Sequence, residues 1–274
     1  EPHAGGDAGP AQQATQQAQC HMKISVHPGR PELGIAAASE AAERLRATCR
    51  QRGVATLVIA TGASQFEVLG TLAGEPEIPW QAVTIFHLDE YVGLSADHPA
   101  SFRRYLRERF IQRLPERPAA FHEIDGNAEP RAECRRLASL VPAGDFDLAL
   151  IGIGENAHLA FNDPPADFET TEPYLVVALD EACRRQQVGE GWFPDLAAVP
   201  TQAISMSVRR ILAAHTLICS VPDRVKAEAV RASIEGPLTP AVPASILRRH
   251  PDCRLHLDLQ SATLLRPSSL IAPT

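Results

Sequence analysis

Four short apolar runs recur along the chain, each bounded by glycine, proline or polar residues. They are LVIA (57–60), VTIFHL (83–88), LALIGIG (148–154) and TLICSV (216–221). Runs of this length without polar alternation are typical of strands that are buried on both faces of a parallel sheet. The run MKISV, which begins at Met22, predicts a further strand at the start of the fold.

Segments with helical spacing of their apolar residues separate these runs. Residues 34–52 carry apolar side chains three or four positions apart, at Ile35, Ala38, Ala42, Leu45 and Cys49. Residues 99–113 predict a helix with Pro99 in its first turn, and residues 223–235 predict one with Asp223 as N-cap. Strands that alternate with helices predict a single α/β domain with a doubly wound, mostly parallel sheet flanked by helices.

Two segments do not follow this alternation. Residues 1–21 are rich in alanine, glutamine and glycine and hold too few apolar residues to offset the entropy of ordering them. We therefore expect a disordered lead over 1–21 and a folded domain over 22–274. Residues 161–200 are rich in proline and aspartate without a clear period, which predicts a lid or site loop.

Composition narrows the classes of partner. The 26 basic and 33 acidic residues give a net charge of −7, which argues against nucleic acid or an anionic membrane as partner. No run of apolar residues is long enough to span a bilayer. The six cysteines form no CxxC pair, so we expect reduced thiols and a cytoplasmic protein. Whether the chain forms a homo-oligomer stays open.

The residues that follow the apolar runs are the first candidates for a site, because ligands of doubly wound sheets bind at the carboxyl ends of the strands. After 57–60, small and hydroxyl residues precede a predicted helix and could hold a phosphate: Thr61, Gly62, Ala63 and Ser64. After 216–221 comes Lys226, in a chain whose other lysine is Lys23. A plain tight turn and a solvated helix residue are the alternative interpretations.

Two adjacent carboxylates, Asp89 and Glu90, follow the run at 83–88. In an extended backbone they point to opposite faces, so one can face a cleft while the other is solvated or paired. Surface charges on a turn are the alternative.

A glycine-rich loop with a histidine follows the run at 148–154. Its sequence GENAHLAFNDPP places Asn156 and Asp163 around His158, whose imidazole titrates near neutral pH. A structural histidine is the alternative. Anion donors, a carboxylate, a histidine and a lysine at one edge of a sheet together suit proton transfer on a phosphorylated small molecule.

At these residues the chain resembles the glucosamine-6-phosphate deaminase family, which is related to the 6-phosphogluconolactonases. The likeness runs from about Met22 to about Asp258 through LVIATGAS, VTIFHLDEYVGLSADHPASFRRYL, DLALIGIGENAHLAFNDPP, DRVKAEAVRASIEG and PASILRRHPDC. Tyr91 after the carboxylate pair, and Ala160-Phe161-Asn162 after the histidine, favour the deaminase side.

The resemblance implies that glucosamine 6-phosphate and water become fructose 6-phosphate and ammonia, with no organic cofactor or metal. It implies that Asp89 moves the C2 proton to C1 and that His158, with Asn156 and Asp163 beside it, serves ring opening. Lys226 and the loop at 61–65 correspond to phosphate ligands. Further substrate-binding candidates are Glu90 and Gly154.

Three departures from the family pattern matter. The family sequence Asp-Gly-His reads Asn156-Ala157-His158 here, and a family glutamate is shortened to Asp163. Because asparagine cannot balance an imidazolium charge, we expect His158 to stay neutral more easily. The family's phosphate-binding arginine falls near 191–193, where none occurs, so Arg184 or Arg185 is the expected replacement. A 6-phosphogluconolactonase-type hydrolase and a sugar-phosphate-binding protein without turnover remain the alternatives.

Overall fold

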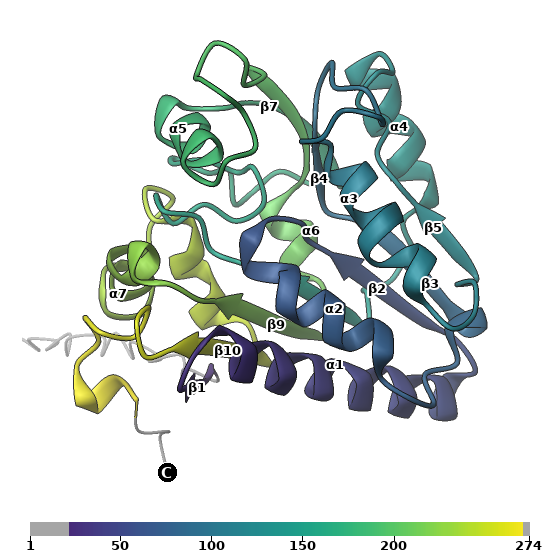
Figure 1. The fold of residues 1–274 in the computed structure, drawn as a ribbon, viewed down its shortest axis with the longest axis horizontal. Helices are drawn as coiled ribbons and strands as arrows, with labels where there is room; N and C mark the ends of the chain where they lie inside the picture. The colour runs from purple at the N-terminus through teal and green to yellow at the C-terminus, as the bar shows by residue number, and fades with distance from the viewer. Residues whose placement is uncertain (1–21, 271–274) are drawn as a thin grey trace, which may run out of the picture.

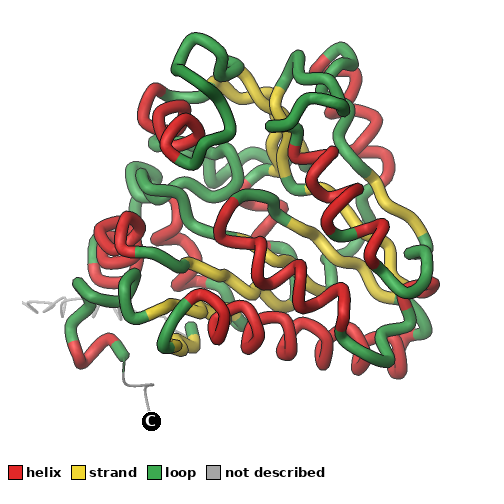
Figure 2. Tube along the Cα trace, in the orientation of Figure 1, coloured by secondary structure: helices red, strands yellow, loops and turns green. Residues whose placement is uncertain are grey.

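The computed structural model describes residues 22–270 (Figure 1). The lead expected over 1–21 lies outside the described residues, so its disorder stays a prediction. The described part of the chain holds one large sheet, one small sheet and helices around them (Figure 2).

The large sheet has seven parallel strands in the order β1-β10-β9-β6-β2-β3-β5. In that order they span Lys23–His27, Cys253–Asp258, Thr216–Val221, Leu148–Ile151, Ala55–Ile59, Val83–His87 and Ala120–His122. The four apolar runs of the sequence are the neighbouring strands β9, β6, β2 and β3, which confirms them as buried parallel strands. The strand that follows β2 in the sequence, β3, lies on one side of it, and the later strand β6 lies on the other side. The strand order therefore reverses between β2 and β6.

Helices cover both faces of this sheet. On one face, Leu57 and Ile59 of β2 pack in a common core with α1 (Arg30–Arg52), α2 (Phe66–Gly74) and α3 (Phe102–Arg109). On the other face, Val58 packs in a core that includes α4 (Pro130–Leu140), α6 (Val208–Leu212) and α7 (Ala227–Glu235). Successive residues of a strand point to opposite faces, so a wholly apolar strand feeds both cores. The expected doubly wound single domain is confirmed.

A three-stranded antiparallel sheet lies above the large sheet in Figure 1. Its strands, in the order β4-β8-β7, span Asp89–Tyr91, Gln202–Met206 and Tyr174–Ala178, and α5 (Glu181–Gly189) follows β7. The expectation that 161–200 is one irregular loop is therefore wrong. The strand β7 forms because β8, which lies outside that segment, pairs with it.

The starts of three helices differ from the sequence-based expectation. Helix α1 begins at Arg30 rather than at residue 34. The N-cap of α3 is Ser101, whose side chain accepts the N–H of Arg104, and Pro99 lies outside the helix. Asp223 does not cap α7, because its φ is 79° and its carboxylate forms an ion pair with Arg30 instead.

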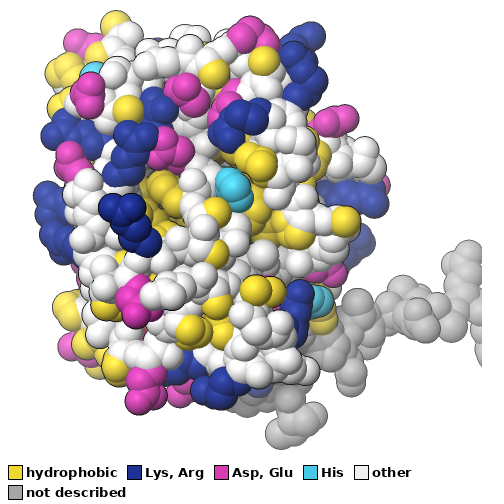
Figure 3. Space-filling model, turned by 90° about the vertical axis from the view of Figure 1, so that its right-hand side faces the viewer, with side chains coloured by type: hydrophobic (Ala, Val, Ile, Leu, Met, Phe, Trp, Pro, Cys, Tyr) yellow, Lys and Arg dark blue, Asp and Glu magenta, His cyan; other side chains and the backbone are white. Residues whose placement is uncertain are grey.

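The helices and one face of the surface can be compared with the expectation that neither a membrane nor nucleic acid is a partner. No helix among residues 22–270 is both long and apolar enough to cross a bilayer. On the face drawn in Figure 3, lysine and arginine side chains are interspersed with aspartate and glutamate side chains. That face therefore presents no continuous basic surface of the kind that binds nucleic acid.

Candidate active site

A cavity of about 300 Å³ lies at the carboxyl ends of β2, β3, β6 and β9, where the strand order reverses. This is the general ligand position of doubly wound folds. The structure brings together in its wall most of the residues singled out in the sequence: Thr61, Gly62, Ala63, Ser64, Asp89, Gly154, His158 and Lys226.

The loop after β2 has the backbone shape of an anion-binding turn. Gly62 has a φ of 107°, which residues with a side chain rarely adopt. The next residues form a short 3-10 turn that leads into α2, so backbone N–H groups at the start of the turn remain available for an anion. Ser64 Oγ would lie 2.7 Å from a Cβ added at Gly152, so the glycine leaves room for this hydroxyl in its present position.

Arg30, at the start of α1, holds this loop in place and was not singled out in the sequence. Its guanidinium donates to the carbonyl of Ala63 at 2.5 Å and to the carboxylate of Glu67 at 3.1 Å, and it also pairs with Asp223. It thereby ties the loop after β2 to the loop after β9. No sequence motif marks this arginine, since its partners are 33 to 193 residues away.

Lys226 is buried in the wall of the same cavity, with 7% of its surface exposed. Burial lowers the pKa of its ammonium group, although nearby carboxylates oppose the shift. The nearest of these is Glu190, whose Oε1 lies 3.9 Å from Nζ of Lys226. The Glu190 carboxylate accepts hydrogen bonds from Gln186 Nε2 and Trp192 Nε1. The cavity wall beside Lys226 therefore contains a carboxylate, whereas the sequence predicted only groups that bind an anion.

Asp89 faces the cavity from the first position of β4. Its Oδ1 is buried without a hydrogen-bond partner among the described residues. Burial, and then the neighbouring charge of Glu90, raise its pKa well above the ordinary aspartate value. A carboxylate that is poorly solvated and unpaired is a stronger base than an ordinary aspartate.

Glu90 points away from the cavity, as the alternation of β4 requires. Its carboxylate accepts the N–H of Arg103 at 2.7 Å, the N–H of Phe102 at 3.2 Å and the hydroxyl of Ser101 at 2.8 Å. It therefore binds the N-terminus of α3, where backbone N–H groups lack helical partners. The expectation that Glu90 binds substrate is not supported by this position.

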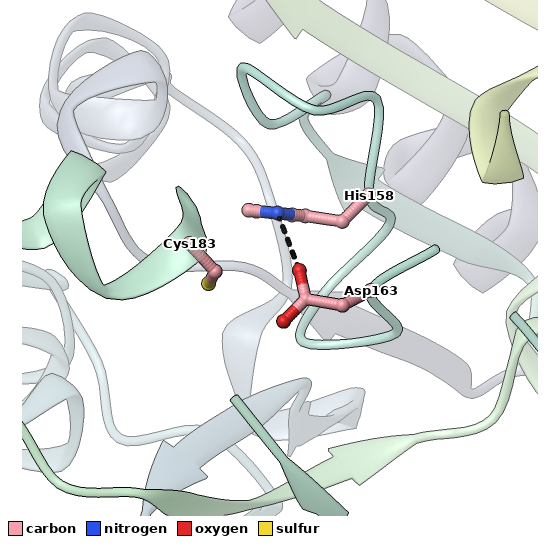
Figure 4. Close-up of side chains that lie close together, drawn as sticks. All are labelled: His158, Asp163 and Cys183. Atoms are coloured by element: carbon pink, nitrogen blue, oxygen red, sulfur yellow. Dashed lines mark ion pairs between the residues drawn. The ribbon is translucent and has the colours of Figure 1, made fainter. Parts of the chain in front are cut away.

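His158 pairs with Asp163 across the loop after β6 (Figure 4). Nδ1 of the imidazole lies 3.2 Å from Oδ1 of Asp163. Burial raises the pKa of Asp163, but the nearby His158 and the hydrogen bonds from Asn156 and from the N–H of Asp180 together leave the pKa lowered. A Cβ at Gly154 would lie 2.2 Å from the imidazole, so this glycine lets the ring pack flat on the backbone.

Asn156 acts on the carboxylate and not on the imidazole. Its Nδ2 donates to Asp163 Oδ1 at 3.0 Å and to Asp180 Oδ2 at 3.1 Å, while its Oδ1 accepts the backbone N–H of His158. The negative charge beside the imidazole therefore comes from Asp163. The argument that asparagine at 156 leaves the histidine without a counter-charge does not hold in this geometry.

The two candidate arginines lie away from the cavity wall. Arg184 donates to the backbone carbonyls of Leu196 and Val199, and Arg185 is an exposed partner of Glu181. Neither replaces the family's phosphate-binding arginine. Arg184, in the first turn of α5, thus holds the loop around Leu196 and Val199, because the carbonyls of that loop accept the hydrogen bonds of its guanidinium.

Helix α5 supplies cavity residues that sequence reasoning missed. Gln186, Gln187 and Glu190 line the cavity together with Glu155. Gln187 Oε1 accepts the hydroxyl of Tyr91 at 2.6 Å, and Gln186 Oε1 accepts the N–H of Glu155 at 3.0 Å. The helix was not expected within 161–200, so its inward face could not be identified.

Comparison with known proteins matches this architecture. The family model described as glucosamine-6-phosphate isomerases/6-phosphogluconolactonase matches residues 28–255. Glucosamine-6-phosphate deaminase 1 of Bacillus subtilis is 36% identical over 232 residues, which cover 82% of this chain and 94% of the relative. Glucosamine-6-phosphate deaminase of Exiguobacterium sibiricum is 37% identical over 210 residues, covering 77% of this chain and 81% of the relative.

Solved structures agree. A monomeric glucosamine-6-phosphate deaminase superposes with a TM-score of 0.82 at 33% identity, covering 89% of this chain and all of that one. A 6-phosphogluconolactonase from Trypanosoma brucei superposes with a TM-score of 0.71 at 21% identity, over 89% and 98% of the two chains, and shows a shared fold alone. The chain therefore belongs to the glucosamine-6-phosphate isomerase/6-phosphogluconolactonase family.

Proposed function

We propose that this protein is an enzyme that converts glucosamine 6-phosphate and water into fructose 6-phosphate and ammonia. The observation that carries the proposal is the unpaired, buried carboxylate of Asp89 in a cavity that also holds an anion-binding turn and the His158–Asp163 pair. The curated relatives named glucosamine-6-phosphate deaminase support the same reaction.

The substrate's phosphate binds at the turn after β2. Backbone N–H groups at Gly62–Ser64 and the side chains of Thr61 and Ser64 surround this end of the cavity, and Lys226 supplies a positive charge. Thr61 Oγ1 is buried without a partner among the described residues, so it is free to donate to a phosphate oxygen. Anchoring the phosphate places the sugar carbons toward Asp89 and His158.

Ring opening is assigned to His158. The imidazole accepts the proton of the C1 hydroxyl and delivers it to the ring oxygen as the bond from C1 to that oxygen breaks, which yields the open-chain aldehyde. Asp163 stabilises the protonated imidazole and fixes the orientation of the ring, because its carboxylate lies 3.2 Å from Nδ1.

Asp89 carries the isomerisation. Its carboxylate removes the proton from C2 to give an enolamine and returns a proton to C1, which leaves an imine at C2. Water adds to this imine, ammonia departs, and the ketone of fructose 6-phosphate remains. Burial and the neighbouring charge of Glu90 raise the pKa of Asp89, which makes its carboxylate a stronger base toward the C2 proton.

Two other functions predict different outcomes. A lactonase needs His158 to activate water and does not need Asp89 as a base toward carbon. A binding protein without turnover was suggested by Asn156, but Asp163 supplies the counter-charge that the imidazole needs. A deaminase that superposes on this chain is described as monomeric, which supports a monomer here. A cytoplasmic location fits a charged substrate that does not cross membranes.

The test is ammonia release from glucosamine 6-phosphate, with galactosamine 6-phosphate and 6-phosphogluconolactone in parallel. Wild type should release ammonia, and Asp89→Asn should not. Asp97→Asn, which changes an exposed carboxylate nearby, is the matched control and should keep wild-type activity. Lactone hydrolysis that persists in Asp89→Asn, without ammonia from either amino sugar, would establish the lactonase instead.

A further inference from the structure

Three potential metal ligands converge behind the cavity wall. The imidazole of His158, the carboxylate of Asp163 and the thiol of Cys183 each place a ligand atom within 4.8 Å of the others. Figure 4 shows that His158 and Asp163 come from one loop and that Cys183 comes from the neighbouring helix α5. The proposed reaction uses the first two residues and has no role for the thiol.

The set of donor atoms favours one class of ion. Nitrogen, oxygen and sulfur donors together suit Zn²⁺ and similar borderline-soft ions, whereas Mg²⁺ and Ca²⁺ prefer oxygen alone. Cys183 is 1% exposed and His158 is 7% exposed, so the ligands are shielded from bulk water. Three protein ligands leave a fourth tetrahedral position for water.

Neighbouring groups hold these ligands in place. Asp163 Oδ1 accepts Nδ2 of Asn156, and its Oδ2 accepts the N–H of Asp180 at 3.0 Å. Asp180 caps α5 by accepting the N–H of Cys183 at 2.6 Å, which fixes the start of the helix that carries the thiol. Oriented partners of this kind strengthen metal sites.

Charge also favours a divalent cation. A thiolate at Cys183 and a carboxylate at Asp163 balance the two positive charges of the ion, so the buried site becomes neutral. Binding therefore replaces the thiol proton, which leaves to solvent.

An ion has a route to these ligands. His158 lines the cavity at the strand ends, while Asp163 lines a second cavity of about 390 Å³ together with Phe161 and Asp180. Two of the three ligands thus lie in cavity walls that an ion can reach, and Cys183 is buried within 4.8 Å of both.

We propose that His158, Asp163 and Cys183 bind one Zn²⁺ ion and that the bound ion inhibits the enzyme. A zinc ion bound to Nδ1 of His158 replaces the pairing of this nitrogen with Asp163, on which the proposed ring-opening step depends, so ring opening stops. The inhibition rests on the proposed function, whereas the binding does not.

Cobalt titration tests the binding without any activity assay. The chelator-treated full chain should bind one equivalent of Co²⁺ and develop the near-ultraviolet charge-transfer band of a thiolate–cobalt bond. Cys183→Ser should lose this band, while Cys134→Ser, at a half-buried cysteine of α4, should keep it. A wild-type protein without the band at one equivalent would overturn the site, whether or not the serine variant folds.

Zinc inhibition tests the consequence. The zinc concentration that halves ammonia release should rise by about tenfold or more in Cys183→Ser and stay unchanged in Cys134→Ser. Equal inhibition of the two variants would overturn the proposal. Cobalt binding without any ammonia release in the absence of metal would instead refute the proposed function and leave the metal site standing.

Discussion

Among single residues, Asp89 shows that the site buries a carboxylate whose ionised form lowers the stability of the fold. Asp89 is buried, lacks a hydrogen-bond partner on Oδ1 and lies beside Glu90. Its folded-state pKa is raised, so the stability that its protonated form contributes at low pH is lost as pH rises through that pKa. The ionised form of this carboxylate therefore destabilises the fold relative to the protonated form.

Replacing Asp89 with asparagine should separate activity from stability. The rate of ammonia release should fall by roughly a hundredfold to ten-thousandfold, the usual contribution of a general base. The melting temperature at pH 7 should rise, because the neutral amide avoids burying a charge. Calorimetry across pH provides the measurement. A gain in stability that does not shrink toward acidic pH would contradict the assignment of the raised pKa.

Glu190 places a negative charge beside Lys226, the proposed phosphate ligand. Its carboxylate lies 3.9 Å from the Lys226 ammonium and competes with a phosphate for that cation. Glu190→Gln should therefore lower the KM for glucosamine 6-phosphate by about threefold to tenfold, with a smaller change in kcat. Glu181→Gln, at the exposed first residue of the helix that Glu190 follows, should change neither the KM nor kcat. A raised KM in Glu190→Gln would show that this carboxylate contacts the sugar favourably.

At the scale of elements, the loop after β6 combines tight turns with a functional histidine. Ala157 and Ala160 have φ values of 65° and 53°, in the left-handed region that costs a residue with a Cβ roughly 1–2 kcal/mol. Ala157 lies between Asn156 and His158, so the strained residue directly precedes the imidazole. The family glycine at this position is free of that cost.

Ala157→Gly should stabilise the protein. Removing the Cβ relieves the left-handed strain but increases the entropy of the unfolded chain, so we expect a net gain of about 0.5–1 kcal/mol in the free energy of unfolding. Ala47→Gly, on the exposed side of α1, should instead cost about 1 kcal/mol. Urea unfolding of both variants measures the change in the free energy of unfolding, which should be positive for Ala157→Gly and negative for Ala47→Gly. Destabilisation by both substitutions would show that Ala157 is not strained.

At the scale of the whole molecule, His87 sits where the two sheets join. It ends β3, its carbonyl accepts the hydroxyl of Tyr174 from β7, and its imidazole is fully buried. Burial and then the charge of Arg103 lower the pKa of His87 to about 3. The folded protein therefore holds this imidazole neutral at pH values where the unfolded chain protonates it.

Acid should weaken the fold through this residue. Stability is full above the unfolded pKa of about 6.5 and is lost as pH falls toward the folded value of about 3. The loss is on the order of several kcal/mol over that window. His87→Gln should flatten the slope of unfolding free energy against pH between 6.5 and 4, whatever its effect at pH 7. If this slope is unchanged in His87→Gln, residues other than His87 cause the acid sensitivity.

The sequence by itself determined the parallel core and the positions of the chemistry along the chain. Runs such as 148–154 and 216–221 are apolar on both faces, which a sheet covered by helices on each side requires. Because parallel strands end at one edge, Asp89, His158 and Lys226 could be placed there before any contact was known. Their local signals lie within a few residues of each strand.

The contacts between distant segments became visible only in the tertiary structure. The partner of β7 is β8, the clamp on the turn after β2 is Arg30, and the carboxylate beside Lys226 is Glu190. Each of these pairings joins segments well separated in the sequence. No local period or capping signal encodes such a pairing, because its free energy comes from burial and hydrogen bonding that exist only once the sheets and helices have packed.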